Sequence, residues 1–463
     1  MGNLFAAIAL FGWVPVVALV FIALPPRRAV IAAFLGAWLF LPMTAVKLGE
    51  GIPAYDKMGA TCIGVLLCVF LFDVRRLQTF RPGWIDLPML IWCLCPMASS
   101  LSNDLGFYDG LSAVFGHLVG WGLPYFIGRA YFRDLASMRE LAIGLFIGGL
   151  IYVPLCLVEI RLSPQLHRGV YGFQQQAFTQ AIRWNGFRPT VFMQHGLMVG
   201  MWMCMTGLIG VWLWSSRSVR ALWHVPAVYW VLALLGTAVL CKSTGAVVLL
   251  AAGLAALFVT RLVRSRVIVW GLVAAAPLYM AFRGSGLWDG ATLSEWASVA
   301  IGEVQGGSLQ YRMHNEDILA AKAMQRPILG WGAWGRARVY DESGRDISIT
   351  DGLWIITLGN QGIVGLASLT LTMLLPAGLM LRRYPVRAWR EPAVAPAIVL
   401  AVVVVLYWID CIPNGMVNPI FMLAVGGLAG TATPMSLRRD QGAHPLIGTS
   451  SPLRVSARLA LDL

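Results

Sequence analysis

Residues 225–260 read VPAVYWVLALLGTAVLCKSTGAVVLLAAGLAALFVT, two apolar runs separated by a short turn that holds the only charged residue, Lys242. Each run is near the length that crosses about 30 Å of hydrocarbon as a helix. A bilayer offers no partner to free backbone N–H and C=O groups, so such runs cross it as helices. This stretch therefore predicts two membrane-spanning helices joined by a tight turn.

The rest of the 463-residue chain repeats this pattern, since 58% of its residues are hydrophobic, 12% are charged and the mean hydropathy is +0.71. A soluble protein of this size cannot bury so much apolar surface. The hydropathy excludes a disordered chain, and eight cysteines spread through apolar runs exclude a secreted disulfide scaffold. We predict an all-α integral membrane protein with about 12–13 transmembrane helices and one large outer loop that contains short helices.

The predicted spans follow directly from the apolar runs. They are 4–24, 29–45, 59–72, 87–101, 110–128, 141–160, 191–214, 225–240, 246–260, 267–282, 352–381, 394–410 and 416–432. These spans divide the chain into N-terminal helices over 1–282 with a short outer loop at 161–190, a large outer loop at 283–351, C-terminal helices over 352–432, and a cytoplasmic tail over 433–463.

The net charge of +13 would suggest nucleic acid in a soluble chain, but here the positive-inside rule explains it without a nucleic-acid partner. The opposite short connections hold only Lys47, Lys57 and Lys242. We therefore place the N-terminus outside and the C-terminus inside. The basic connections, which together hold 21 Lys and Arg residues, are 25–28, 73–86, 129–139, 215–224, 261–266, 382–393 and the tail from 433.

Local patterns predict structure in the large loop and between helices. Residues 312–326 are typical of a short helix that ends before Pro327, and the glycines of 330–335 predict a tight turn. No His or Cys spacing indicates a metal site. Three pairs of glycines four residues apart predict close helix packing: Gly116 and Gly120, Gly144 and Gly148, and Gly196 and Gly200.

Four polar residues fall at the predicted outer boundary of the membrane, where a charge is costly unless it is paired or used. They are Arg188, Lys242, Arg312 and Asp351. Arg188 and Arg312 could instead anchor loops at the lipid headgroups or pair with Glu316, and Lys242 could be an interfacial anchor. Asp351 could serve at a helix start, where an acid is favoured.

Two histidines and Glu316 are secondary candidates. His195 falls inside the seventh predicted span and His314 on the loop helix, and each could be either a packing residue or a proton acceptor. Glu316 is the next carboxylate that could act as a base after Asp351.

Several motifs, taken in order, resemble the O-antigen ligase and polymerase family of bacterial membrane glycosyltransferases. The resemblance covers roughly residues 120–370. Its motifs are LPYFIGR at 123–129, FRP and QHG at 187–189 and 194–196, STGA at 243–246, YRMHNED at 311–317, RPILGWG at 326–332 and DGLWIITLGNQGIVGL at 351–366.

The resemblance implies an enzyme of the bacterial inner membrane, with both outer loops in the periplasm. Such an enzyme takes glycan from an undecaprenyl-pyrophosphate carrier without a metal or other cofactor. By motif match, Arg188 and Arg312 would hold the pyrophosphate, with Lys242 as a further contact. Ligases of this family place a His where this chain has Asp351, which favours a polymerase over a ligase. Its partners would be the lipid-linked oligosaccharide, a glycan acceptor, membrane lipids and other polysaccharide-assembly proteins.

The chemistry can be stated without the family. A sugar on pyrophosphate is already activated, so transfer needs the charge of the leaving group neutralised and the acceptor hydroxyl positioned. Arginine suits phosphate because its planar fork binds two oxygens and stays protonated. A transporter or flippase of the same lipid-linked glycan is the main alternative, and would show inverted repeats and charges at mid-membrane. A scaffold or secretion component would leave the outer arginines unexplained.

Overall fold

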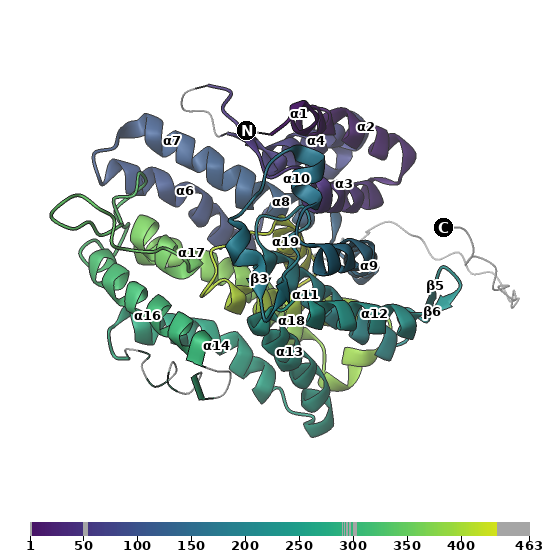
Figure 1. The fold of residues 1–463 in the computed structure, drawn as a ribbon. Coiled ribbons are helices and arrows are strands. Elements are labelled where there is room, and N and C mark those ends of the chain that lie inside the picture. The colour runs from purple at the N-terminus through teal and green to yellow at the C-terminus, as the bar shows by residue number, and fades with distance from the viewer. Residues whose placement is uncertain are drawn as a thin grey trace, which may run out of the picture. The chain divides into compact units, whose positions relative to one another are not determined.

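The computed structural model describes residues 2–49, 54–288, 290, 292, 295, 298–299 and 303–432. The tail predicted over 433–463 lies outside the described residues, as does part of the large loop between 289 and 302. The described chain is helical almost throughout (Figure 1), which confirms the predicted all-α membrane fold.

The helices alternate with short connections along the whole described chain. Before residue 180 they are α1 (Leu4–Phe11), α2 (Trp13–Ala23), α3 (Pro26–Phe40), α4 (Lys57–Phe72), α5 (Val74–Gln78), η1 (Trp84–Asp86), α6 (Leu87–Leu101), α7 (Gly106–His117), the π-helical η2 (Leu118–Gly122), α8 (Leu123–Tyr131), α9 (Leu135–Leu162), α10 (Leu166–Tyr171) and η3 (Phe178–Ala181). After it they are α11 (Gly196–Ser215), α12 (Ala227–Leu240), α13 (Thr244–Val263), α14 (Val267–Gly284), α16 (Glu303–Ala323), α17 (Leu353–Arg383), η4 (Val386–Arg390), α18 (Ala395–Asp410) and α19 (Pro419–Ala432).

Every predicted span overlaps at least one of these helices. Within the described residues, seven helices are long and apolar enough to cross a membrane, and the bent pair α1 and α2 would make an eighth. The apolar helices α4, α12, α18 and α19 have only 14 to 16 residues each. The multi-pass character is therefore confirmed, while several of the predicted spans are shorter than a full crossing.

Among the described residues, three short antiparallel hairpins interrupt the helices. They are β1 (Ala45–Val46) with β2 (Tyr55–Asp56), β3 (Ile182–Arg183) with β4 (Gly186–Phe187), and β5 (Ala221–Leu222) with β6 (Val225–Pro226). In Figure 1 the β5–β6 hairpin lies at the right, and the loop that follows α16 lies at the left.

The basic connections predicted to share one side of the membrane do contact one another. Arg27, at the start of α3, donates to the carboxylate of Asp134 before α9 at 3.1 Å. Arg139 of α9 donates to the carbonyl of Ser218 at 2.9 Å, and the hydroxyl of Ser218 donates to the carbonyl of Pro392 at 3.1 Å. These connections therefore lie at the same end of the helices, as alternating spans require.

The remaining connections meet one another at the opposite end, which we call the outer end. Contacts that join them are those of Met43 with His167, Asn103 with Gly330, Arg183 with Lys242, and Arg312 with Pro413.

Helix α17 is interrupted at Gly362, inside what the sequence predicts as one continuous span. The φ of 65° and ψ of −164° at Gly362 are accessible only to glycine. The N–H groups of Ile363 and Val364 donate to the carbonyls of Pro327 and Ile328 at 2.7 and 3.2 Å. The loop after α16 thus satisfies backbone groups that the interruption would leave free inside the protein.

The turn predicted at 330–335 completes this contact. Gly330 and Gly332 have positive φ angles of 70° and 76°, which confirms the tight turn. The N–H of Trp331 donates to the carbonyl of Gly359 at 2.8 Å, and Asn103 of the α6–α7 connection donates to the carbonyl of Gly330 at 2.9 Å. The large loop is therefore bound to α6 and α17, and the start of α17 has a fixed position.

Two of the three predicted glycine pairs are confirmed as close packing positions. A Cβ at Gly148 would lie 3.1 Å from the ring of Trp202, and one at Gly200 would lie 2.3 Å from Ser243. The prediction is wrong for Gly116 and Gly120, where a Cβ would meet nothing within 4 Å. Spacing on one helix identifies small residues, but it does not tell whether another helix approaches them.

Candidate functional site

Arg188 follows the β3–β4 hairpin and is largely buried, with 7% of its surface exposed. Its Nη2 and Nε donate to the carbonyl of Lys242 at 2.9 and 3.3 Å. In return, Nζ of Lys242 donates to the carbonyls of Arg183 and Trp184 at 3.1 and 3.3 Å. The α12–α13 turn and the hairpin therefore hold each other, and both place a cation at the outer end.

A buried carboxylate at the end of α9 fixes the segment that follows Arg188. Glu159 is fully buried, and it accepts hydrogen bonds from the N–H groups of Thr190 and Val191 at 2.7 Å each and of Leu166 at 2.9 Å. Val191 has a φ of 48°, which is unfavourable for a β-branched residue. The charge-assisted bonds to Glu159 offset this strain and so set where Arg188 lies.

Replacing Glu159 with glutamine is expected to lower stability. The amide keeps one acceptor oxygen but turns an NH₂ group toward backbone N–H donors, at a cost of about 1–3 kcal/mol. A lower midpoint of thermal unfolding of the purified protein measures this. Glu140→Gln is the matched control, because Glu140 lies on the same helix but is partly exposed, and its ion pairs with Arg27 and Arg28 are long, at 3.8 and 3.7 Å. Equal midpoints for both variants would contradict the role of Glu159.

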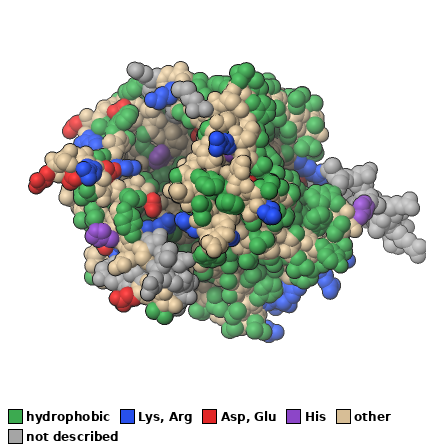
Figure 2. All heavy atoms as spheres, in the orientation of Figure 1, with side chains coloured by type: hydrophobic (Ala, Val, Ile, Leu, Met, Phe, Trp, Pro, Cys, Tyr) green, Lys and Arg blue, Asp and Glu red, His purple; other side chains and the backbone are tan. Residues whose placement is uncertain are grey.

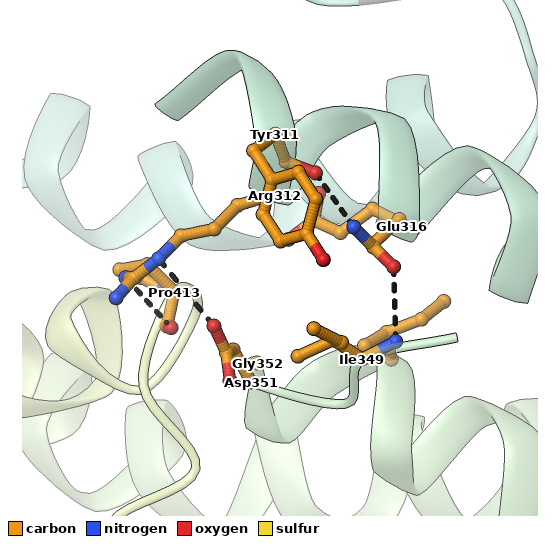
Figure 3. Close-up of a pocket in the computed structure, with 9 residues that line it drawn as sticks. Tyr311, Arg312, Glu316, Ile349, Asp351, Gly352 and Pro413 are labelled. Carbon is orange, nitrogen blue, oxygen red and sulfur yellow. Dashed lines mark hydrogen bonds and ion pairs between the residues drawn. The ribbon is translucent and has the colours of Figure 1, made fainter. Parts of the chain in front are cut away.

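Arg312 of α16 faces the chain just before α17 (Figure 3). Its Nε lies 3.6 Å from a carboxylate oxygen of Asp351, and its Nη1 donates to the carbonyl of Pro413 at 3.2 Å. The side chains of Arg312 and Asp351 are 30% and 45% exposed. They border a small pocket that Ile349 and Ile355 also line. This ion pair is thus open to a ligand from the outer end.

The α18–α19 connection forms hydrogen bonds with Arg312 and with the backbone of Asp351. The side-chain oxygen of Asn414 accepts from Nη1 of Arg312 at 3.4 Å, and the Asn414 amide donates to the carboxylate of Asp410 at 3.2 Å. The N–H of Gly415 donates to the carbonyl of Asp351. The backbone on both sides of the Arg312–Asp351 pair is therefore anchored.

The cations lie close enough to affect one another. Burial and, to a smaller extent, the charges of Arg183 and Arg312 lower the pKa of Arg188 to about 10. Burial also lowers the pKa of His195 to about 4, with the charges of Arg188, Arg183 and Arg312 acting in the same direction. Arginines more than a hundred residues apart in the sequence therefore create one region of positive potential, which favours an anionic ligand.

His195 does not offer a free base in this arrangement. It lies at the N-cap of α11, where its Nδ1 accepts from the N–H of Leu197 at 3.1 Å. Nε2 must then carry the proton, and it donates to the side chain of Gln180 at 3.2 Å. Both ring nitrogens are engaged, so His195 orders the start of α11 beside Arg188.

Glu316 lines the same pocket as Arg312 and Asp351, but its carboxylate contacts other residues. Glu316 is buried, and its carboxylate accepts from Tyr279 at 2.7 Å and from Trp354 at 3.0 Å. Its charge partner is Arg283, at 3.5 Å, in place of the predicted alternatives Arg188 and Arg312. Burial raises the pKa of Glu316. His314 is exposed on α16.

The structure corrects one role and adds residues that the sequence does not single out. The N-cap of α17 is Gly352, so the predicted capping role of Asp351 is wrong. Arg183 joins the cluster because the β3–β4 hairpin turns it toward His195, and Asn414 and Asp410 join it through Arg312. The Pro, Asn and Gly residues at 413–415, between two apolar runs, are the local signal for that connection.

No family model matches the chain, and no curated protein matches it either. Among the described residues, no three His, Cys, Asp or Glu side chains are grouped so that they could hold a metal ion. The site is best characterised by its own chemistry. It is a set of arginines with one half-exposed carboxylate.

Proposed function

We propose that the protein is an inner-membrane glycosyltransferase of the O-antigen ligase and polymerase type. It moves glycan from an undecaprenyl-pyrophosphate carrier at the periplasmic face, during biosynthesis of a surface polysaccharide. The observation that supports this most is the convergence of Arg188, Lys242 and Arg312 at the outer end, with Asp351 paired to Arg312. Pyrophosphate needs cations of this kind, and the acceptor hydroxyl needs a base.

The reaction follows from these groups. The acceptor hydroxyl oxygen forms a bond to C1 of the carrier-linked sugar, and the bond between C1 and the pyrophosphate oxygen breaks. The leaving oxygen keeps the electron pair, and the guanidinium groups of Arg188 and Arg312 neutralise its charge. The carboxylate of Asp351 accepts the proton of the hydroxyl. The products are the extended glycan and undecaprenyl pyrophosphate.

A polymerase is favoured over a ligase because the ligases of the family that this sequence resembles carry a histidine at the position of Asp351. The product distinguishes them. A polymerase lengthens the chain that remains on the carrier, whereas a ligase moves the chain to a lipopolysaccharide core and leaves its length unchanged.

A transporter of the same lipid-linked glycan is the second candidate, favoured by the interruption of α17 at Gly362. Carriers use broken helices to bind cargo with free backbone groups. Here the loop at 327–332 already bonds those groups. The interruption therefore serves to dock the large loop, which favours the transferase.

The topology behind this proposal predicts that the loop at 283–351 faces the periplasm and the tail faces the cytoplasm. We expect a periplasm-dependent reporter to be active when it is inserted at Ser343, which lies in the exposed loop, and inactive when it is fused after Arg439. The reverse pattern would place the arginine cluster on the cytoplasmic side and contradict the proposed carrier chemistry.

The transfer itself is tested with purified protein and a lipid-linked oligosaccharide. We expect longer carrier-bound chains on gels, with the same rate in the presence of EDTA, because arginines supply the charge that metal ions supply elsewhere. A rate that falls with EDTA and returns with Mg²⁺ or Mn²⁺ would contradict the metal-free mechanism. Movement of unaltered lipid-linked glycan across vesicles, without chain growth, would favour the transporter.

A further inference from the structure

A cavity of about 420 Å³ opens at the outer end, apart from the pocket at Arg312. Figure 2 shows a hollow on this face of the molecule, in the region between α7 and α10. Its volume falls within the range of small-molecule sites. The lining comes from elements far apart in the sequence, including Trp38, Lys57, Trp121 and Gln194.

The wall formed by α7 and η2 is open because of its glycines. Gly116 and Gly120 line the cavity, and a Cβ at either would meet no atom within 4 Å. Gly120 lies within the π-helical turn η2 (Leu118–Gly122). Turns of π-helix are rare in proteins, and those that occur are often found at functional sites. The two glycines therefore leave space for a ligand, where the sequence predicts close helix contact.

A buried lysine lies in the wall of the cavity, next to Asp56. Lys57 is only 4% exposed, and its Nζ lies 4.3 Å from the centre of the Trp38 ring. Among the described residues, its side chain donates one hydrogen bond, to the carbonyl of Trp38 at 3.3 Å. An ammonium carries three donors, so two remain for a ligand. Asp56 also lines the cavity, but its carboxylate caps α4 by accepting from the N–H of Gly59 at 2.8 Å, and the described residues show no ion pair within 4.0 Å between Asp56 and Lys57. Buried lysines are rare without an acidic group in contact, and an anionic ligand group would supply that contact.

Two segments join this cavity to the arginine cluster. Gln194 of the lining precedes His195, which lies beside Arg188. Gly415 of the lining bonds the carbonyl of Asp351. A glycan whose pyrophosphate contacts the arginines therefore has this cavity within reach of its sugars.

We propose that the cavity binds a sugar residue that carries a carboxylate, with the Lys57 ammonium on the carboxylate. The inference rests on the proposed function, since that function makes the ligand a glycan. It adds that the glycan is acidic. The Gln194 amide matches the polar hydroxyls of a sugar. The indoles of Trp38 and Trp121 match the flat apolar face of its ring.

The test measures binding without transfer, on full-length protein in nanodiscs of zwitterionic lipid. The probes are two trisaccharides that differ only in one residue, glucuronate in one and glucose in the other. We expect the glucuronate probe to bind about 10-fold tighter or more, as a charge-assisted hydrogen bond implies. Lys57→Met should remove this preference, and Lys57→Arg should keep part of it.

Matched variants separate the ligand effect from folding. Lys47→Met removes an exposed lysine of the neighbouring hairpin and should leave the preference unchanged. Gly116→Leu places a side chain in the cavity, where its Cβ would meet no atom within 4 Å, and should weaken both probes equally. Equal affinity of wild-type protein for the two probes would overturn the proposal. So would a preference that survives in Lys57→Met.

A lipid headgroup is the other source of an anion. If nanodiscs with phosphatidylglycerol abolish binding of the glucuronate probe through Lys57, the cavity belongs to a lipid and the sugar proposal falls. Failure of the proposed function looks different. In that case the glucuronate probe still binds through Lys57, but the purified protein transfers no glycan. If the protein transfers glycan but binds the two probes equally, only the present inference is overturned.

Discussion

Replacing Arg312 with alanine is expected to lower glycan transfer at least about 10-fold while the protein remains folded in the membrane. The guanidinium is 30% exposed and faces the pocket, so it is free to bind phosphate oxygens. A charge-assisted contact of this kind contributes about 1.5–3 kcal/mol or more in a partly desolvated site. Its ion pair with Asp351, at 3.6 Å and half-exposed, contributes less than about 1 kcal/mol to stability.

Arg188→Ala should have a similar effect on transfer. Because Arg188 is buried against the Lys242 carbonyl, alanine there also removes packing, and Arg188→Lys is the cleaner variant. Lysine keeps the charge but loses the planar fork, so we expect it to restore only part of the activity at either position.

The measurement is the length of carrier-linked glycan made by equal amounts of membrane protein. Arg338→Ala is the matched control, since Arg338 lies in the same loop but pairs with Asp346 at the surface. It should retain wild-type transfer. Wild-type product from both the Arg188 and Arg312 variants would rule out the phosphate-binding role.

Hydropathy and local turn chemistry predict the framework of this site well, because both report on the immediate surroundings of a residue. The spans follow from the apolar runs, the turn at 330–335 from its glycines, and the common outer end of Arg188 and Arg312 from alternating connections. These features depend on solvent and backbone geometry alone.

What could not be predicted depends on contacts between distant segments. Glu159 looks like an acid near the end of a span, and only the structure brings it to the N–H groups of Thr190 and Val191. Gly116 and Gly120 match a packing motif, yet they border a cavity because no other helix covers them. The N-cap of α17 moves to Gly352 because the neighbouring backbone of Asp351 is tied to Gly415.

Asp351→Asn is expected to lower the rate of transfer by about 10²–10⁴-fold, the range of general-base assistance. Asparagine keeps the size of the side chain but cannot accept the proton of the acceptor hydroxyl. The backbone carbonyl of Asp351 keeps its bond to Gly415, and capping is left to Gly352, so folding should not change.

Separate measurements of kcat and of the KM for the lipid-linked donor decide how Asp351 acts. A base contributes only when the hydroxyl attacks, so its loss should lower kcat and leave donor KM unchanged. If Asp351 instead orients Arg312, the donor KM should rise as well, because the phosphate contact weakens. Full activity in Asp351→Asn would reject both roles. The base would then be sought at Glu316, whose carboxylate lines the same pocket, and Glu316→Gln should show the fall in kcat that Asp351→Asn lacked.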